Sequence, residues 1–137
     1  MSEAPSNHES LISAILAAIS RRPGIELAIL FGSLAAGAGR GDSDLDLAVD
    51  AGRRLTASEK MALISDLADG IGRPLDLVDL RAVGEPLLGQ ILRHGKRILG
   101  SDTLYANVIR RHLFDEADYL PYRDRILAER RRAWIGK

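Results

Sequence analysis

The sequence feature that most constrains this chain is a pair of alternate aspartates, Asp44 and Asp46, which follows Gly32-Ser33 after ten intervening residues. An apolar run over residues 25–31 predicts a strand that ends at this glycine. The two aspartates, separated and followed by apolar residues, predict a second strand over residues 44–49. Side chains alternate between the faces of a strand, so both carboxylates should point one way and the apolar side chains toward a core.

The two aspartates are costly to place on one strand face, because aspartate disfavours strands and like charges repel. A bound cation would offset this cost. Gly32 would let a ligand approach the backbone, and Ser33 would cap a following helix whose free N–H groups attract anions. These features predict a site that holds Mg²⁺ against a nucleoside triphosphate. The alternatives are a solvated strand face for the aspartates and an ordinary strand-to-helix turn for Gly32-Ser33.

The length of 137 residues predicts one domain. Hydrophobic residues make up 46% and charged residues 28%, as in ordinary globular proteins, and the formal net charge of zero argues against a general nucleic-acid binder. The chain has no cysteine, no apolar run long enough to span a membrane, and no signal-peptide pattern. We therefore expect a cytoplasmic protein that contacts neither membrane nor nucleic acid.

The spacing of apolar residues, capping boxes and glycines predicts an α/β (α+β) fold in which helices pack on a small sheet. The other expected elements are a helix that opens at Ser6–Glu9 and ends at Pro23-Gly24, a helix from Thr56 to about Gly72, a strand over 74–80, a short helix from Pro86 to Gly95, an edge strand over 97–99, and helical sequence from Ser101 to about Trp134, broken or kinked at Pro121. The strand order stays open.

The Gly-Ser and Asp-x-Asp motifs at this spacing, with the wording Leu-Phe-Gly-Ser-Leu-Ala over residues 30–35, resemble the nucleotidyltransferase superfamily that includes DNA polymerase β. Residues 8–100 look most like its minimal nucleotidyltransferase (MNT) domains, which include the MntA-type antitoxins paired with HEPN toxins. The resemblance implies a mixed sheet of the polymerase β-like nucleotidyltransferase fold. We expect residues 1–100 to form the core and residues 101–137 a helical extension of the same domain.

The resemblance also implies a third acid on the next strand, and Asp76 and Asp79 compete for that role. Three residues apart on a strand means opposite faces, so both cannot reach the site. We choose Asp76, because it lies in mid-strand between apolar residues, where an unpaired charge would be costly. Asp79 suits the end of the strand and a cap for the segment that follows.

The resemblance implies Mg²⁺-dependent transfer of AMP from ATP to a hydroxyl, expected on a tyrosine, of a HEPN ribonuclease toxin, which would neutralise the toxin in a hetero-oligomer. Two Mg²⁺ would be bound by Asp44, Asp46 and Asp76, the last of which would also activate the hydroxyl. Gly32 and Ser33 would bind the β- and γ-phosphates. The alternatives are a non-catalytic antitoxin that acts by binding and occlusion, and a small-molecule nucleotidyltransferase of the aminoglycoside-modifying type.

Two further features bear on this resemblance. Many relatives carry an arginine near the position of Ala36, and Arg40 is a candidate replacement. The histidines at positions 8, 94 and 112 are expected at the surface or at helix ends. No arginine stands four to six residues before any of them, so the chain lacks the Arg–His motif of HEPN toxins and resembles the antitoxin side.

The C-terminal segment is the last distinctive feature. From Arg123 to Lys137 there are six Lys or Arg and two Asp or Glu, hence a charge of +4. Aromatic residues interleave with these arginines. Such residues are common anchors at protein interfaces, so the segment is a candidate docking surface formed by Tyr119, Tyr122, Arg123 and Trp134. The main alternative is an ordinary amphipathic helix, and RNA contact is a third.

Overall fold

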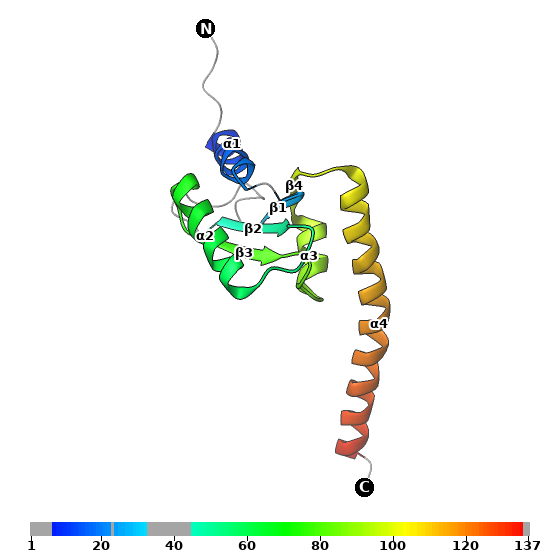
Figure 1. Cartoon of the computed structure of the whole chain (residues 1–137). Coiled ribbons are helices and arrows are strands. Elements are labelled where there is room, and N and C mark those ends of the chain that lie inside the picture. Colours follow the sequence, from blue (N-terminus) through cyan, green and yellow to red (C-terminus); the bar gives the residue numbers. More distant parts are fainter. Residues whose placement is uncertain (1–6, 23, 33–44, 136–137) are drawn as a thin grey trace.

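The computed structural model describes residues 7–22, 24–32 and 45–135. The chain forms, in order, α1 (Asn7–Ser20), β1 (Leu27–Phe31), β2 (Leu45–Asp50), α2 (Ala57–Ile71), β3 (Leu75–Asp79), α3 (Leu87–His94), β4 (Lys96–Leu99) and α4 (Asp102–Ile135). The sheet has the strand order β3-β2-β1-β4, with β2 and β3 parallel and the other pairs antiparallel (Figure 1). The predicted α/β class with a small mixed sheet is therefore confirmed.

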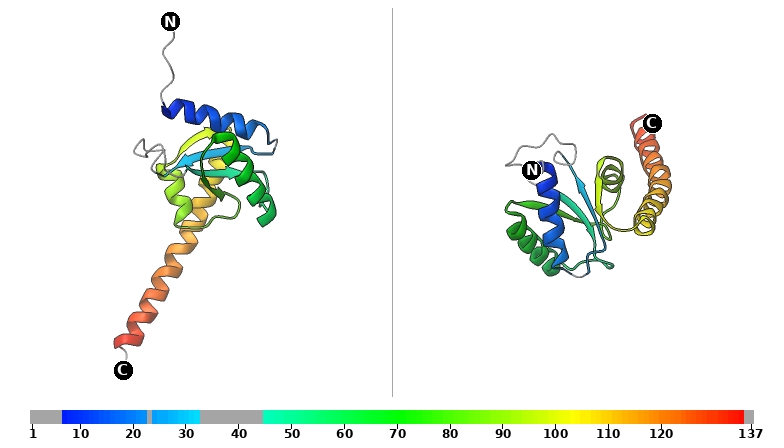
Figure 2. Two further views of the ribbon diagram at one scale, coloured as in Figure 1. Left: turned by 90° about the vertical axis from the view of Figure 1, so that its left-hand side faces the viewer. Right: turned by 90° about the horizontal axis from the view of Figure 1, so that it is seen from above.

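Helices cover both faces of the sheet. Figure 2 shows α1 and α2 on one face and α3 with α4 on the other. Leu45, Leu47 and Val49 of β2 lie in the core cluster under α1 and α2. Ala48, on the opposite face of the same strand, lies in a second cluster with residues of α3 and α4. Asp46 is two residues before Ala48, so it lies on the same face of β2. Farther along the strand this face is buried, because α3 and α4 cover it.

Local sequence signals account for the ends of α2. The side chain of Thr56 accepts a hydrogen bond from the backbone N–H of Glu59, and the Glu59 carboxylate accepts one from the Thr56 N–H, which makes the predicted capping box. Gly72 ends the helix in the left-handed conformation at φ 83°. These contacts need only neighbouring residues, so the sequence located the helix well.

The predicted break at Pro121 is wrong, because α4 is one continuous helix from Asp102 to Ile135. A proline removes a single hydrogen bond from a helix, and the turns on either side keep theirs. The other predicted elements are confirmed with ends that differ by a few residues, except the helix expected after Ser33, which lies outside the described residues. The edge strand pairs with β1 as β4.

Candidate nucleotide and metal site

The first component of the site is the close contact between the end of β1 and Asp46. Gly32 follows β1 with φ +79°, in the left-handed region that favours glycine. A Cβ added at Gly32 would lie 2.1 Å from the Oδ2 atom of Asp46. Phe31 and Asp46 are register partners across β1 and β2, which explains why the carboxylate reaches this glycine. A side chain at this position would therefore strain the backbone and displace the Asp46 carboxylate.

The second component is a pair of carboxylates on neighbouring strands. Asp46 and Asp76 are register partners in the parallel pair β2–β3. Adjacent strands lie about 4.8 Å apart and partners share a face, so the two side chains leave the sheet side by side. Asp46 is half-buried and Asp76 is exposed. Two carboxylates this close repel each other, and a divalent cation between them would remove that repulsion.

These residues fit a magnesium site in the chemistry of their donors. Carboxylate oxygens are the ligands that Mg²⁺ prefers, and the glycine backbone leaves space for a phosphate beside them. Among the described residues no group of three or more metal-binding side chains occurs. The predicted Asp44 and Ser33, as well as Ala36 and Arg40, lie outside the described residues. The described part of the chain thus supplies two carboxylates and the glycine.

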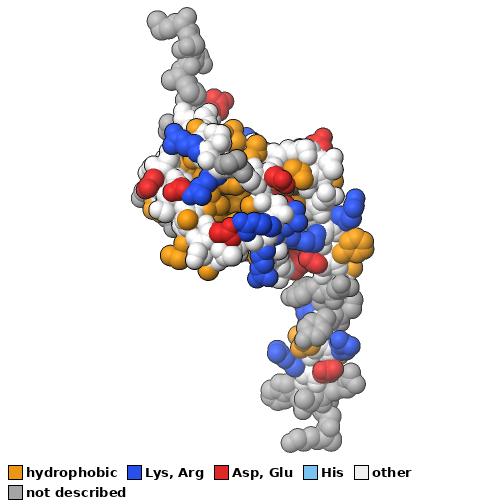
Figure 3. Space-filling model, viewed as in Figure 1, with side chains coloured by type: hydrophobic (Ala, Val, Ile, Leu, Met, Phe, Trp, Pro, Cys, Tyr) orange, Lys and Arg blue, Asp and Glu red, His pale blue; other side chains and the backbone are white. Residues whose placement is uncertain are grey.

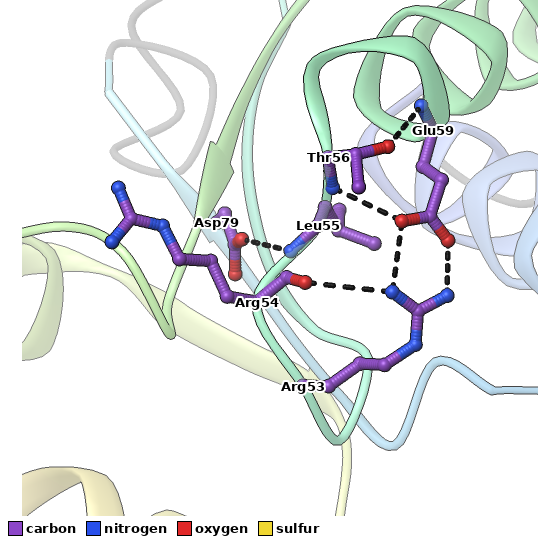
Figure 4. Close-up of polar contacts among 6 residues, drawn as sticks. All are labelled: Arg53, Arg54, Leu55, Thr56, Glu59 and Asp79. Atoms are coloured by element: carbon purple, nitrogen blue, oxygen red, sulfur yellow. Dashed lines mark hydrogen bonds and ion pairs between the residues drawn. The ribbon is translucent and has the colours of Figure 1, made fainter.

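Asp79 lies on the other face of β3 and has a structural role. Its side chain is 5% exposed. It accepts hydrogen bonds from the backbone N–H groups of Leu55, at 2.8 Å, and Arg81, at 2.9 Å. Figure 4 shows the first of these bonds, which ties the segment before α2 to the end of β3. Asp79 therefore holds two chain segments together, away from the face that carries Asp46 and Asp76.

A further buried acid, Asp50, was not singled out from the sequence. It is 4% exposed, accepts a hydrogen bond from Gly52 N–H at 2.8 Å, and pairs with Arg81 Nε at 2.9 Å. The hydrogen bond to Asp50 and the charge of that carboxylate raise the pKa of Arg81. Asp50 lies at the end of β2 far from Gly32, so this ion pair stabilises the turn after β2. The only signal for Asp50 in the sequence was its position four residues after Asp46, which places both side chains on the same face of β2.

The capping box of α2 is extended by an arginine. Arg53 pairs with the Glu59 carboxylate, with one N–O distance of 2.8 Å (Figure 4). The side-chain hydrogen bond from Arg53, followed by the backbone hydrogen bond from Thr56, lowers the pKa of Glu59 to about 2. Both groups are at the surface, so this pair orders the helix start and does not belong to the site.

The histidines differ in their surroundings. His94 is exposed at the end of α3, as predicted, and His8 lies in the first turn of α1, with its side chain outside the described residues. His112 is not a surface residue: its side chain is 12% exposed between Glu85 and Glu116, and its Nε2 lies 3.1 Å from the latter carboxylate. A Cβ added at Gly89 would lie 2.8 Å from its ring, so α3 approaches α4 closely here. The expectation for His112 is therefore wrong, because long-range packing surrounds it.

The predicted docking residues all fall in α4. Arg123 is exposed, and the side chains of Tyr119, Tyr122 and Trp134 lie outside the described residues. The structure describes three exposed apolar side chains on α4. These are Leu113, Phe114 and Leu127, which are 59%, 66% and 51% exposed. Leu113 and Leu127 lie 14 residues apart, a spacing that can be read from the sequence.

Comparison with known proteins finds similar sequences and similar structures. The family model described as polymerase beta, nucleotidyltransferase matches residues 13–104. A protein named protein adenylyltransferase MntA, from Shewanella oneidensis, is 36% identical over 87 residues, which are 61% of this chain and 63% of the relative. This chain thus matches about three fifths of the length of that relative.

None of the helices in the described part is long and apolar enough to cross a membrane.

Solved structures match over more of the chain. A chain from a toxin–antitoxin complex with AMP-PNP superposes with a TM-score of 0.73 at 27% identity, covering 90% of this chain and 98% of the other. A chain from a complex of a tri-AMPylated Shewanella oneidensis HEPN toxin with an MNT antitoxin gives a TM-score of 0.66 at 26% identity, covering 88% and 98%. The likeness therefore includes α4 as well as the sheet.

Proposed function

This chain belongs to the polymerase β nucleotidyltransferase family, and we propose that it is an antitoxin-type protein adenylyltransferase. It transfers AMP from ATP to a hydroxyl, most simply a tyrosine, of a HEPN-type toxin in the same cytoplasm, with which it forms a hetero-oligomer. The observation that carries this proposal is the register that places Asp46 beside Asp76, with Gly32 against the first carboxylate. Similarity to a protein adenylyltransferase and to chains from toxin–antitoxin complexes supports it.

Asp46 and Asp76 would hold Mg²⁺, together with Asp44, which precedes β2 in the sequence. The ions would supply positive charge against the triphosphate oxygens and the departing pyrophosphate. Similarity to a chain crystallised in a complex with AMP-PNP supports ATP as the donor.

The two described carboxylates would do different work because their exposure differs. Asp76 is exposed, so an acceptor hydroxyl from another protein can reach it. Its carboxylate would accept the hydroxyl proton as that oxygen bonds to the α-phosphorus and the bond to pyrophosphate breaks. Asp46 is half-buried against Gly32, which restricts its side chain and suits a purely ligating role. Gly32 would present its backbone to the phosphates, with Ser33 as a neighbour in the sequence.

The test is the intact mass of a HEPN-type protein that binds this chain, after incubation with this chain, ATP and Mg²⁺. We expect a mass gain of one or more AMP groups that is lost when Asp46 and Asp76 are both changed to Asn. The same incubation with GTP, CTP or UTP would define the base preference. An unchanged mass with the native chain would overturn the proposal.

The exposed apolar residues of α4 favour one alternative, neutralisation by binding alone, since docking there would need neither carboxylate. A toxin-neutralisation assay separates the two functions. Under the proposal, the variant with both aspartates replaced binds the toxin and fails to neutralise it. Under occlusion, it neutralises as well as the native chain.

A further inference from the structure

The α4 helix is much longer than its contact with the rest of the molecule. It has 34 residues, hence a length of about 50 Å. Its first turns are packed: Val108 is 6% exposed in the second core cluster, and His112 contacts Glu85 of the segment before α3. Figures 1 and 2 show its C-terminal half standing clear of the sheet and of the other helices. Helices gain most of their stability from packing, so this half is suited to pack in an assembly.

Apolar residues lie along one side of α4, from the end of its packed turns near His112 into the projecting half. Leu113 and Leu127 are 59% and 51% exposed. They lie two heptads apart, which is close to four helical turns, so they share one face of the helix. In the sequence the same spacing continues: leucine recurs at positions 113, 120 and 127, and tryptophan stands at 134. A seven-residue repeat is typical of helices that pack lengthwise against another helix. Leu113 and Leu127 are called the α4 stripe below.

Basic residues border the α4 stripe. Arg123, Arg130 and Arg131, which are three or four residues from Leu127 along the helix and so lie beside it, are all exposed. Figure 3 shows Lys and Arg side chains on both sides of the projecting part of the helix. Residues 123–137 contain six Lys or Arg and two Asp or Glu, so two such segments from two copies would repel each other. The charge therefore favours an acidic partner surface over a second copy of this helix.

The helix also lies on the side of the sheet that bears the site. Val108 of α4 shares its core cluster with Ala48 of β2. Ala48 is two residues from Asp46, so it points from the same strand face as that carboxylate and its partner Asp76. A protein held along α4 would be kept beside the face on which the two carboxylates lie.

We propose that the α4 stripe docks lengthwise against a helix of the protein substrate, whose apolar stripe is bordered by Asp and Glu. Docking there would raise the effective concentration of the acceptor hydroxyl near Asp76. This inference rests on the proposed function for the identity of the partner, the HEPN-type protein. The docking itself is measured without any AMP transfer.

The experiment compares two variants of the full chain with matched controls by calorimetric titration of the purified HEPN-type protein. Leu113→Glu with Leu127→Glu removes the α4 stripe, and Met61→Glu is its control, because Met61 is 72% exposed on α2. Arg123→Glu with Arg131→Glu reverses the bordering charge, and Arg54→Glu, an exposed residue before α2, is its control. Circular dichroism and titration with ATP and Mg²⁺ establish that each variant is folded.

We expect the stripe variant to bind the partner at least tenfold more weakly and the charge variant to lose affinity with a reduced dependence on salt. Both controls should bind as the native chain does, and nucleotide affinity should be the same in all. Native affinity in the stripe variant would overturn the inference, as would a native homodimer that this variant dissociates. If the native chain binds the partner through the stripe but transfers no AMP, the docking stands and the proposed function fails.

Discussion

Asp46 and Asp76 are direct partners across the parallel strands β2 and β3, so two carboxylates occupy neighbouring positions on one face of the sheet. Gly32 closes on the first of them from the end of β1. Three segments that are distant in sequence thus meet at one edge, where a hard cation and a phosphate could be held together. Asp46, Asp76 and Gly32 can each be replaced separately. Asp79 serves as the comparison for Asp76, and Gly72 serves as the control for Gly32.

Replacing Asp44 and Asp46 together by Asn should abolish AMP transfer and leave the fold intact. The change removes negative charge at the proposed metal site, and the loss of repulsion toward Asp76 should leave the melting temperature unchanged or higher. Thermal unfolding followed by circular dichroism and the mass of the partner protein are the measurements. Full transfer by this variant would refute the assignment of the site.

Asp76→Asn and Asp79→Asn should have opposite effects. The first should reduce transfer at least a hundredfold with little change in stability, because Asp76 is exposed and faces the site. The second should lower the free energy of unfolding by about 1–3 kcal/mol, because the buried Asp79 carboxylate accepts two backbone hydrogen bonds. Its transfer rate per folded molecule should be near native. Rate measurements and urea unfolding on both variants would expose a reversed assignment.

Gly32→Ala should abolish nucleotide-dependent activity. The new Cβ would overlap Asp46 Oδ2, and φ +79° is unfavourable for alanine, at a cost of about 1 kcal/mol or more. Gly72→Ala is the matched control, since its φ is +83° and a Cβ there meets no atom within 4 Å. Both variants should be destabilised by backbone strain, while only the first should lose ATP binding in calorimetry. Equal activity of the two variants would show that Asp46 tolerates displacement.

The pair Arg53–Glu59 should make stability depend on pH in the acid range. The pKa of Glu59 falls from its ordinary 4.5 to about 2 through the hydrogen bond from Arg53. The contribution is therefore fully present above pH 4.5, declines as the unfolded chain takes up a proton, and is lost as pH falls through about 2. NMR titration of the Glu59 carboxyl in the native chain and in Arg53→Gln tests this. The titration midpoint should rise toward 4.5 in the variant, and an unchanged midpoint would contradict the assigned cause.

Deleting residues 119–137 should weaken binding of the partner protein more than it weakens folding. Among the described side chains of α4, the core clusters include none beyond Val108, and Gly32, Asp46 and Asp76 all precede position 80. ATP titration should give a near-native affinity for the truncated chain. If the truncated chain does not fold, the segment is part of the core. An unchanged affinity for the partner would place docking elsewhere.

The local features of this protein could be predicted from the order of its residues. Thr56 and Glu59 marked the start of α2 because a capping box involves only residues three apart. The alternation of side chains along a strand separated Asp76 from Asp79, and the structure places them on opposite faces of β3 as that rule requires. The Gly-Ser and Asp-x-Asp spacing was sufficient to predict the family, since it reports a strand, a loop and a strand in succession.

Which segments meet depends on the packing of the folded chain and could not be predicted from local patterns. The strand order β3-β2-β1-β4, which makes Asp46 and Asp76 neighbours, depends on contacts between residues 30 positions apart in the chain. Burial of His112 against Glu85 and the pairing of Asp50 with Arg81 arise in the same way. Periodicity assigns a side chain to a face of its own element, whereas its neighbours follow from how that element packs. For that reason the sequence predicted the carboxylates individually, and the folded sheet placed Asp46 beside Asp76.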